Sequence, residues 1–332
     1  MTAPVLAVRD LRTSFATPRG KLVAVDGVDL ELRKGETLCV VGESGCGKSV
    51  TALSILRLLP EPPAQIERGE ILFEGRDLRA LGAEELRALR GNRIAMIFQE
   101  PMTSLNPVFR VGDQIEEALR VHRSLSRTER EARVIELLEL VGIPEPRARM
   151  RDYPHQLSGG MRQRVMIAMA LANDPAVLIA DEPTTALDVT IQAQILELLE
   201  SLKKRFDMAV LFITHDLGVV AETGQRVAVL YAGRVVETGT VEQIFAAPQH
   251  PYTRGLLDSL PSARTKARES LRVIPGRVPD LVARPAGCSF RERCTRAVSR
   301  CASEDPALTV GRGGALVACH NPVPAPGAGD AR

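Results

Sequence analysis

The sequence is poor in aromatic residues and has no long apolar segment. The first absence limits what its core can be built from, and the second argues against a membrane-spanning protein. It contains no tryptophan, three tyrosines and eight phenylalanines, so its core must be built mainly from Leu, Val, Ile and Ala. No run approaches the roughly 18 apolar residues of a membrane-spanning helix. The first residues, MTAPVLAVRDLR, lack the basic start and apolar stretch of a secretory signal. We therefore expect a cytosolic protein.

An excess of charge of one sign is also absent, and cysteine is scarce. The 43 basic and 41 acidic side chains leave a net charge of +2, which is not the pattern of a nucleic-acid binder. Four of the six cysteines nevertheless fall near the end of the chain, at Cys288, Cys294, Cys301 and Cys319. In the reducing cytosol, such a cluster favours a metal site over disulfides.

The hydrophobic pattern predicts an α/β fold. The runs AVLIAD and MAVLFIT are continuously apolar, as in strands of a parallel sheet that is covered on both faces. Alternating residues over 1–40 indicate antiparallel strands, and the spacing over 106–169 is helical. After about residue 247, Pro, Arg and Gly increase and the periodicity fades. We predict a domain over 1–250 with a helical subdomain at about 104–170, and an extension over 251–332 whose last dozen residues are disordered.

The stretch GESGCGKS matches the phosphate-loop pattern G-x-x-x-x-G-K-[ST]. It comprises Gly42, Glu43, Ser44, Gly45, Cys46, Gly47, Lys48 and Ser49. Glycines allow successive N–H groups to surround phosphates, and the following helix adds its positive N-terminus. Lys48 would reach the terminal phosphates of a nucleotide, and the Ser49 hydroxyl would bind Mg²⁺. The alternative, a chance glycine-rich turn, is disfavoured because the loop follows an apolar strand and opens a helix.

Two acids, Asp181 and Glu182, end the apolar run VLIADEP. Open α/β sheets bind ligands beyond the carboxyl ends of their strands. Asp181 would hold Mg²⁺ through water, and Glu182 would act as the general base on the attacking water. A solvated acidic turn is the alternative for this pair taken alone.

A second anion-binding helix start is predicted at LSGGMRQR. Ser158 has the character of a helix N-cap, and Gly159 and Gly160 follow it. One chain has no evident need of two such sites.

The order of these motifs along the chain explains why one chain has two anion-binding helix starts. The phosphate loop, Gln99, LSGGM, VLIADEP, ALD and THD lie as in ATP-binding cassette (ABC) proteins, which the chain resembles over about residues 5–245. The resemblance implies a P-loop NTPase fold with a RecA-like core sheet, an antiparallel β subdomain and a helical subdomain. In that family, two cassettes meet head to tail, and the signature of one closes on the ATP of the other. The signature acting in trans would be Leu157, Ser158, Gly159, Gly160 and Met161.

The resemblance also implies roles for four further residues. Gln99 would contact the metal and the attacking water, and His215 would hold the γ-phosphate in register with Glu182. Asp188 would lie at the dimer seam, and Phe15 would stack on adenine. Without the resemblance, His215 would be interpreted as a capping or core histidine. Since no expected catalytic residue is missing, the chain is expected to hydrolyse ATP.

Longer stretches, including YPHQLSGGMRQRVMIAMAL and HPYTRGLL, resemble the ATPase subunits of bacterial dipeptide and oligopeptide importers. This implies a peripheral subunit at the cytoplasmic face of the inner membrane. By that resemblance, its partners would be a second cassette that is a distinct paralogue, two transmembrane permeases and an extracytoplasmic solute-binding protein. Relatives also serve nickel, glutathione or opine-like solutes. A soluble cassette ATPase acting on ribosomes or DNA is a further alternative, but no tandem cassette, coiled-coil insertion or basic surface supports it.

The spacing of the four late cysteines leaves their role open. Five, six and seventeen residues separate them, whereas structural zinc sites usually contain closer pairs. Four thiolates suit an iron–sulfur cluster, and reduced cysteines without metal fit the spacing as well. The importer resemblance implies a four-iron four-sulfur (4Fe–4S) cluster that stabilises the extension, with zinc or no metal as alternatives.

Several other residues have simpler expected roles. His320 is a spare ligand candidate, and Cys39 is expected to be a small buried apolar residue. The arginines around the cluster are interpreted as a solvated surface, with a face for a partner subunit as the alternative: Arg291, Arg293, Arg296 and Arg300.

Overall fold

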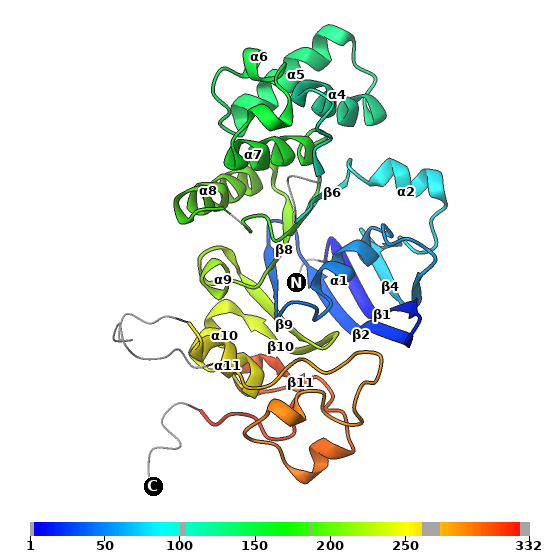
Figure 1. The fold of residues 1–332 in the computed structure, drawn as a ribbon, viewed down its shortest axis with the longest axis vertical. Helices are drawn as coiled ribbons and strands as arrows, with labels where there is room; N and C mark the ends of the chain where they lie inside the picture. The colour runs from blue at the N-terminus through cyan, green and yellow to red at the C-terminus, as the bar shows by residue number, and fades with distance from the viewer. Residues whose placement is uncertain (1–2, 100–103, 186, 261–272, 326–332) are drawn as a thin grey trace. The chain divides into compact units, whose positions relative to one another are not determined.

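The computed structural model describes residues 3–99, 104–185, 187–260 and 273–325 (Figure 1). They form two compact units. Unit 1 comprises 1–6, 32–37 and 72–213, and unit 2 comprises 7–31, 38–71 and 214–332. Both combine strands with helices, which confirms the α/β prediction. Within the described part of the chain, no helix is long and apolar enough to cross a membrane. Of the last dozen residues, predicted to be disordered, 326–332 lie outside the described residues.

Three parallel strands run through unit 1: β6 (Ile94–Ile97), β7 (Val177–Asp181) and β8 (Ala209–Thr214). Val177 pairs with Ile94 on one side and with Ala209 on the other. Every residue of β7 and β8 is buried. The continuous apolar runs thus form strands without a solvent-facing side, as predicted.

Helices make up most of the rest of unit 1. They are α2 (Ala83–Leu89), α4 (Val111–His122), α5 (Arg127–Leu140), α6 (Pro146–Arg149), η1 (Pro154–Gln156), α7 (Gly159–Ala170) and α8 (Val189–Phe206). Helices α4, α5 and α7 pack against one another in the green part of the ribbon, and α7 also packs on β6 (Figure 1). Val111, Ile115 and Leu119 are fully buried at intervals of four residues, so the predicted helical spacing forms the packed face of α4.

One sheet of the protein has the strand order β2-β1-β4-β5. Its strands are β1 (Leu6–Thr17), β2 (Gly20–Leu32), β4 (Ala64–Phe73) and β5 (Arg76–Asp77). In β2, Val28, Leu30 and Leu32 are buried while Asp29 and Glu31 are exposed. This two-residue alternation gives the strand one core face and one solvent face.

The other strands of unit 2 lie in the order β11-β12-β10-β9-β3. They are β3 (Thr37–Val41), β9 (Arg226–Tyr231), β10 (Arg234–Thr240), β11 (Thr309–Val310) and β12 (Leu316–Val317). Strand β3 is parallel to β9, and the remaining pairs are antiparallel. The α-helices of this unit are α1 (Lys48–Ile55), α9 (Leu217–Thr223), α10 (Val241–Ala246) and α11 (Pro251–Asp258), and its short 3-10 helices are η2 (Arg291–Arg293), η3 (Ser299–Ala302) and η4 (Arg312–Gly314).

The late part of the chain extends this sheet. Val317 of β12 pairs with Glu237 of β10, and Thr309 of β11 pairs with Val317. Both strands have only two residues, too few to show a periodic pattern in the sequence. The segment after residue 250 is therefore joined to unit 2 by backbone hydrogen bonding.

Candidate nucleotide-binding site

The phosphate loop joins β3 to α1 through a backbone that glycine adopts most readily. Gly42, Gly45 and Gly47 have φ angles of 155°, 78° and 104°. A Cβ atom on Gly42 would lie 2.3 Å from the carbonyl oxygen of Leu230, and one on Gly47 would lie 2.5 Å from that of Ala24. Both obstacles are backbone atoms, so the turn requires residues without a side chain.

Lys48, the first residue of α1, folds back over the loop. Its Nζ atom donates hydrogen bonds to the carbonyl oxygens of Gly42, at 2.8 Å, and Glu43, at 3.2 Å. The residue is buried, and Ser49 beside it is partly exposed. An ammonium group is thus fixed over a glycine-rich turn at a helix N-terminus, where anions are favoured. This arrangement suits a polyphosphate.

The two cysteines of this region are structural. Cys39 in β3 is fully buried, as predicted, and so is Cys46 in the loop. Burial raises the pKa of the Cys46 thiol, which keeps it protonated near neutral pH and unreactive.

Two more predicted site residues lie in unit 2. Phe15 is a partly exposed residue of β1. His215 is exposed and follows β8 directly, at a strand end of the kind where α/β sheets bind ligands. Asp216 then caps α9, because its Oδ1 atom accepts a hydrogen bond from the N–H of Gly218 at 2.8 Å.

Glu182 of unit 1 is held in a strained conformation after β7. Its φ angle is 47°, in the left-handed region that costs a non-glycine residue about 1–3 kcal/mol. Its Oε2 atom accepts hydrogen bonds from Nε2 of Gln99, at 3.2 Å, and from Oγ1 of Thr185, at 2.8 Å. Its N–H donates to the carbonyl of Ile213 at 2.9 Å. The buried Asp181 precedes it, so two acids stand at the strand end, and Gln99 lies beside the second.

The signature stretch begins α7 with a capped first turn. Ser158 is the N-cap, and its Oγ atom accepts a hydrogen bond from the N–H of Met161 at 3.3 Å. Leu157 is buried. A Cβ atom on Gly160 would lie 2.9 Å from Cγ2 of Ile191, whereas one on Gly159 would meet nothing within 4 Å. The helix start is thus packed on one side and open on the other.

Asp188 lies beside this helix start. It caps α8, and its Oδ1 atom accepts a hydrogen bond from the N–H of Ile191 at 2.9 Å. The side chain of Ile191 is the same one that limits the space at Gly160. Unit 1 therefore brings the predicted signature and the predicted dimer-seam residue together.

Two residues without a predicted role contact the phosphate loop at Glu43. The N–H of Glu43 donates to the hydroxyl of Tyr252 at 2.9 Å, and its carboxylate pairs with Arg293. The prediction that Arg293 belongs to a solvated surface is wrong, since 6% of its side chain is exposed. A run of arginines in a sequence carries no sign of which one is buried against an acidic partner. Arg300, with 63% exposed, fits the surface prediction.

The four late cysteines are free thiols in unit 2. Burial raises the pKa of Cys288 and Cys294, and raises that of Cys319 to about 11. The charges of Cys288, Cys294 and Cys301 all act on Cys319, so the four lie near one another. Among the described residues, however, no group of three or more His, Cys, Asp or Glu side chains is placed to hold a metal ion. The predicted 4Fe–4S and metal-binding site is therefore not supported by the placement of the described side chains.

His320, the spare ligand candidate, has one ring nitrogen close to the main chain. Its Nε2 atom lies 3.0 Å from the carbonyl oxygen of Glu304, at hydrogen-bonding distance.

Comparisons with known proteins agree with the site. An ABC transporter family model matches residues 25–185, and a model of the oligopeptide/dipeptide transporter C-terminal region matches 236–301. The chain is 55% identical over 304 residues to the oligopeptide transport ATP-binding protein OppD of Bacillus subtilis (strain 168), covering 92% of this chain and 85% of that protein. It is 53% identical over 306 residues to the dipeptide transport ATP-binding protein DppD of the same organism, covering 92% and 91%.

A solved structure shares the fold at 30% sequence identity. It is the dimeric structure of MJ0796, a bacterial ABC transporter cassette, with a TM-score of 0.64 over 71% of this chain and 98% of that one. This similarity confirms the cassette prediction and gives no support to the predicted cysteine-rich extension.

The fold and the phosphate-loop geometry define an ATP-hydrolysing cassette. At 53–55% identity over most of its length, the chain belongs to the family of ATP-binding proteins of oligopeptide and dipeptide ABC transporters.

Proposed function

We propose that this chain powers the uptake of dipeptides or oligopeptides across the bacterial inner membrane by hydrolysing ATP. The names of the relatives support the solute class, since OppD and DppD are transport ATP-binding proteins for oligopeptides and dipeptides. The observation that carries the catalytic part is the position of Glu182, whose carboxylate is held by Gln99 and Thr185.

The chemistry follows from these residues. Lys48 and the loop N–H groups bind the phosphates, and His215 orients the γ-phosphate. Glu182 accepts a proton from a water molecule whose oxygen attacks the γ-phosphorus, and the bond to ADP breaks. Bound Mg²⁺ supplies positive charge that offsets the phosphates, and Ser49, Gln99 and Asp181 would hold it. Phe15 would stack on the adenine.

The signature acts on the ATP of a partner cassette. Ser158, Gly159 and Gly160 form a capped helix start, which attracts anions, and the open space at Gly159 gives phosphate room to approach. The dimeric state of the related MJ0796 cassette supports this arrangement. Asp188 would then lie at the seam, and the partner would be a distinct paralogue.

Other chains complete the transporter in this proposal. Two permeases carry the membrane path, an extracytoplasmic solute-binding protein delivers the solute, and this subunit sits at the cytoplasmic face through the permeases. Residues 1–250 form the ATPase domain with a helical subdomain at about 104–170, and 251–332 form the C-terminal extension.

Co-purification and reconstitution test the proposal. The tagged chain should bring down two membrane permeases, and peptides should stimulate its ATPase activity once it is reconstituted with them. Stimulation by nickel, glutathione or an opine-like solute alone would replace the peptide substrate. Ribosomal RNA or DNA in place of permeases would replace import altogether.

The 4Fe–4S cluster on Cys288, Cys294, Cys301 and Cys319 stays a separate proposal. It is supported by the importer resemblance and by the mutual proximity of the thiols, whereas their described arrangement does not fit a metal ion. No step of ATP hydrolysis depends on it. Protein purified without oxygen should be brown and contain iron and sulfide. Colourless protein with stoichiometric zinc, or with no metal, would overturn this proposal.

A further inference from the structure

Arg293, from the late part of the chain, forms an ion pair with Glu43 of the phosphate loop. Arg293 ends the short helix η2 (Arg291–Arg293) and lies 250 positions after Glu43. Its Nη1 atom donates to Oε2 of Glu43 at 2.8 Å, and its Nη2 atom donates to Oε1 at 2.9 Å. Two parallel hydrogen bonds between opposite charges fix both the position and the plane of the carboxylate.

The guanidinium group is enclosed on several sides. It lies 5.7 Å from the ring centre of Tyr231 and 5.9 Å from that of Phe290. Its Nε atom donates to the carbonyl oxygen of Pro275 at 2.8 Å. Because the head group is held by these contacts, it forms a rigid partner for Glu43.

Tyr252 holds the backbone of the same loop residue. Its hydroxyl accepts the N–H of Glu43 at 2.9 Å, and its ring lies 4.7 Å from that of Tyr231. Tyr252 is fully buried. Glu43 is therefore held by its main chain and its side chain together, both times by residues after 250.

A second contact reaches the loop through the turn between β9 and β10. Arg284 donates to the carbonyl oxygen of Ala232 and to Oδ2 of Asp26, the latter at 2.6 Å. In the same turn, the N–H of Gly233 donates to the carbonyl oxygen of Cys46 at 2.9 Å. The carbonyl of Gly233 accepts the N–H of Asp26 at 2.8 Å. The turn thus connects Arg284 with the far side of the phosphate loop.

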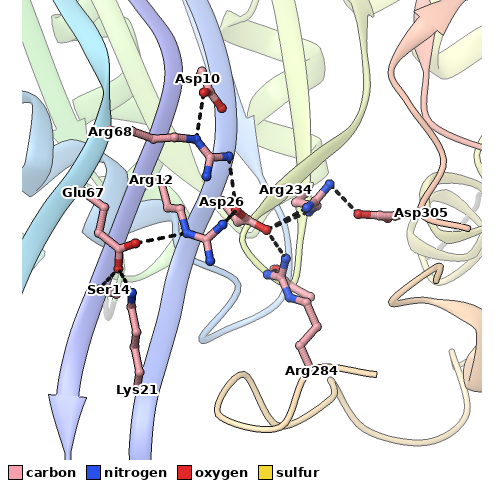
Figure 2. Close-up of polar contacts among 11 residues, drawn as sticks. Asp10, Arg12, Ser14, Lys21, Asp26, Glu67, Arg68, Arg234, Arg284 and Asp305 are labelled. Carbon is pink, nitrogen blue, oxygen red and sulfur yellow. Dashed lines mark hydrogen bonds and ion pairs between the residues drawn. The ribbon is translucent and has the colours of Figure 1, made fainter. Parts of the chain in front are cut away.

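Asp26 anchors this second contact (Figure 2). Its carboxylate meets arginines from β1, β4, β10 and the late segment, namely Arg12, Arg68, Arg234 and Arg284. Arg234 also pairs with Asp305. A buried carboxylate shared by four cations ties the late segment to both sheets of unit 2.

We propose that the segment after residue 250 braces the phosphate loop, and that Arg293 is a positioning residue of the ATP site acting through Glu43. The proposal rests on the ATPase function above. Loop N–H groups must converge on the phosphates, and the brace fixes the loop at Glu43 and Cys46. Restricting a binding loop to its bound conformation raises affinity, because less freedom is lost on binding.

Loss of the contact between Arg293 and Glu43 should change the Kd and KM for ATP more than kcat. Without Arg293, the loop samples more conformations, so ATP binds more weakly. Once ATP is bound, its phosphates hold the loop in the binding conformation, so kcat changes little. We expect Arg293→Ala to raise the Kd for ATP and the KM roughly tenfold, which corresponds to about 1.4 kcal/mol of lost preorganisation, while kcat stays within about twofold.

A double-mutant cycle on the full chain tests this assignment. The variants are Arg293→Ala, Glu43→Ala and the double substitution, with Arg293→Lys to keep the charge without the two-pronged geometry. Arg300→Ala is the matched control, because Arg300 lies in the same cysteine-containing stretch and is exposed. The measurements are the Kd for a fluorescent ATP analogue, KM, kcat and thermal unfolding.

The brace predicts that the two single substitutions weaken binding and that the double variant is no weaker than the worse single one. Arg293→Lys should fall between wild type and Arg293→Ala, and Arg300→Ala should match wild type. Unchanged affinity in Arg293→Ala and Arg293→Lys would overturn the brace alone, provided the wild type is active. So would additive effects of the two substitutions, or a loss confined to kcat. A wild-type chain that neither binds nor hydrolyses ATP would overturn the proposed function and the brace with it.

Discussion

The hydroxyl of Tyr252 accepts the backbone N–H of Glu43 at 2.9 Å, which joins α11 to the phosphate loop across 209 positions of sequence. The N–H of Tyr252 in turn donates to Nδ1 of His250 at 3.0 Å, and the N–H of His250 donates to Oε2 of Glu237 at 2.9 Å. The HPY stretch therefore links β10 to the loop through a buried series of hydrogen bonds.

His250 should make stability depend on pH. Burial lowers its pKa from 6.5 to about 3, so the folded protein keeps the ring neutral. The unfolded chain takes up a proton below about 6.5, so the contribution to stability is present above that pH and is lost as pH falls towards 3. We predict that the free energy of unfolding drops by about 1 kcal/mol or more per pH unit within this window.

The variant His250→Asn removes the titrating ring but keeps a side-chain acceptor for the N–H of Tyr252. Urea unfolding at pH 7 and pH 5 should show a smaller difference for this variant than for wild type. His155→Asn, at an exposed position, serves as control. Equal pH dependence in all three proteins would contradict the assignment.

Asp26→Asn should be strongly destabilising. Burial raises the pKa of Asp26, but the hydrogen bond and charge of Arg234 and the charges of Arg284 and Arg12 outweigh it, so the pKa lies below its usual 3.8. Its contribution is thus present above about 3.9 and lost as pH falls through the folded pKa. Removing the charge takes a shared partner from four partly exposed arginines, and it weakens the charged hydrogen bonds that Arg234 and Arg284 donate, at a cost of about 2 kcal/mol at pH 7.

The control for Asp26 lies on the same strand. Asp29→Asn changes an exposed residue and keeps an acceptor for the N–H of Asp10. Urea unfolding should separate the two variants clearly at pH 7. A similar small effect of both substitutions would mean that the charged cluster does not stabilise the fold.

Gly42→Ala and Gly45→Ala should differ in stability although both add one methyl group to the phosphate loop. Both positions have positive φ angles, at 155° and 78°, and left-handed strain alone costs an alanine about 1–2 kcal/mol. Only Gly42 also faces backbone, at 2.3 Å from the Leu230 carbonyl oxygen. Gly42→Ala should therefore have the lower midpoint in thermal unfolding, and equal midpoints would contradict the steric argument.

The sequence was informative where chemistry depends on neighbouring residues. Gly42 and Lys48 lie in one loop, and Asp181 and Glu182 follow one strand, so their motifs and strand ends could be predicted. The side-chain contact between Gln99 and Glu182 joins residues 83 positions apart and was not predicted, since the family resemblance implied only that each acts on the attacking water.

Contacts between distant segments were not predictable from patterns. Arg293 and Glu43 each look like a solvent-exposed residue in the sequence, and only the folded chain shows that they form an ion pair in which Arg293 is buried. The two-residue strands β11 and β12 depend on pairing with β10 for their structure. The metal prediction at the cysteines rested on residue type and resemblance, neither of which specifies how the side chains are placed.

The signature should matter for turnover more than for binding. Ser158→Arg places a bulky cation where the partner's ATP would bind, so we expect ATPase activity to be lost while the chain still binds ATP at its own loop. Ser201→Arg, at an exposed position of α8, is the control. Full activity of Ser158→Arg, in a chain that sediments as a monomer during turnover, would contradict hydrolysis between two cassettes.

Glu182→Gln removes the proposed general base, since an amide keeps the shape of the side chain but cannot accept the proton of the attacking water. Glu222→Gln, at an exposed position, controls for loss of a carboxylate elsewhere. The measurement is the rate of phosphate release at saturating Mg-ATP, alongside binding of an ATP analogue. We expect at least about a hundredfold loss of turnover in Glu182→Gln, with ATP binding retained. Hydrolysis at the wild-type rate would contradict the role of Glu182 as general base.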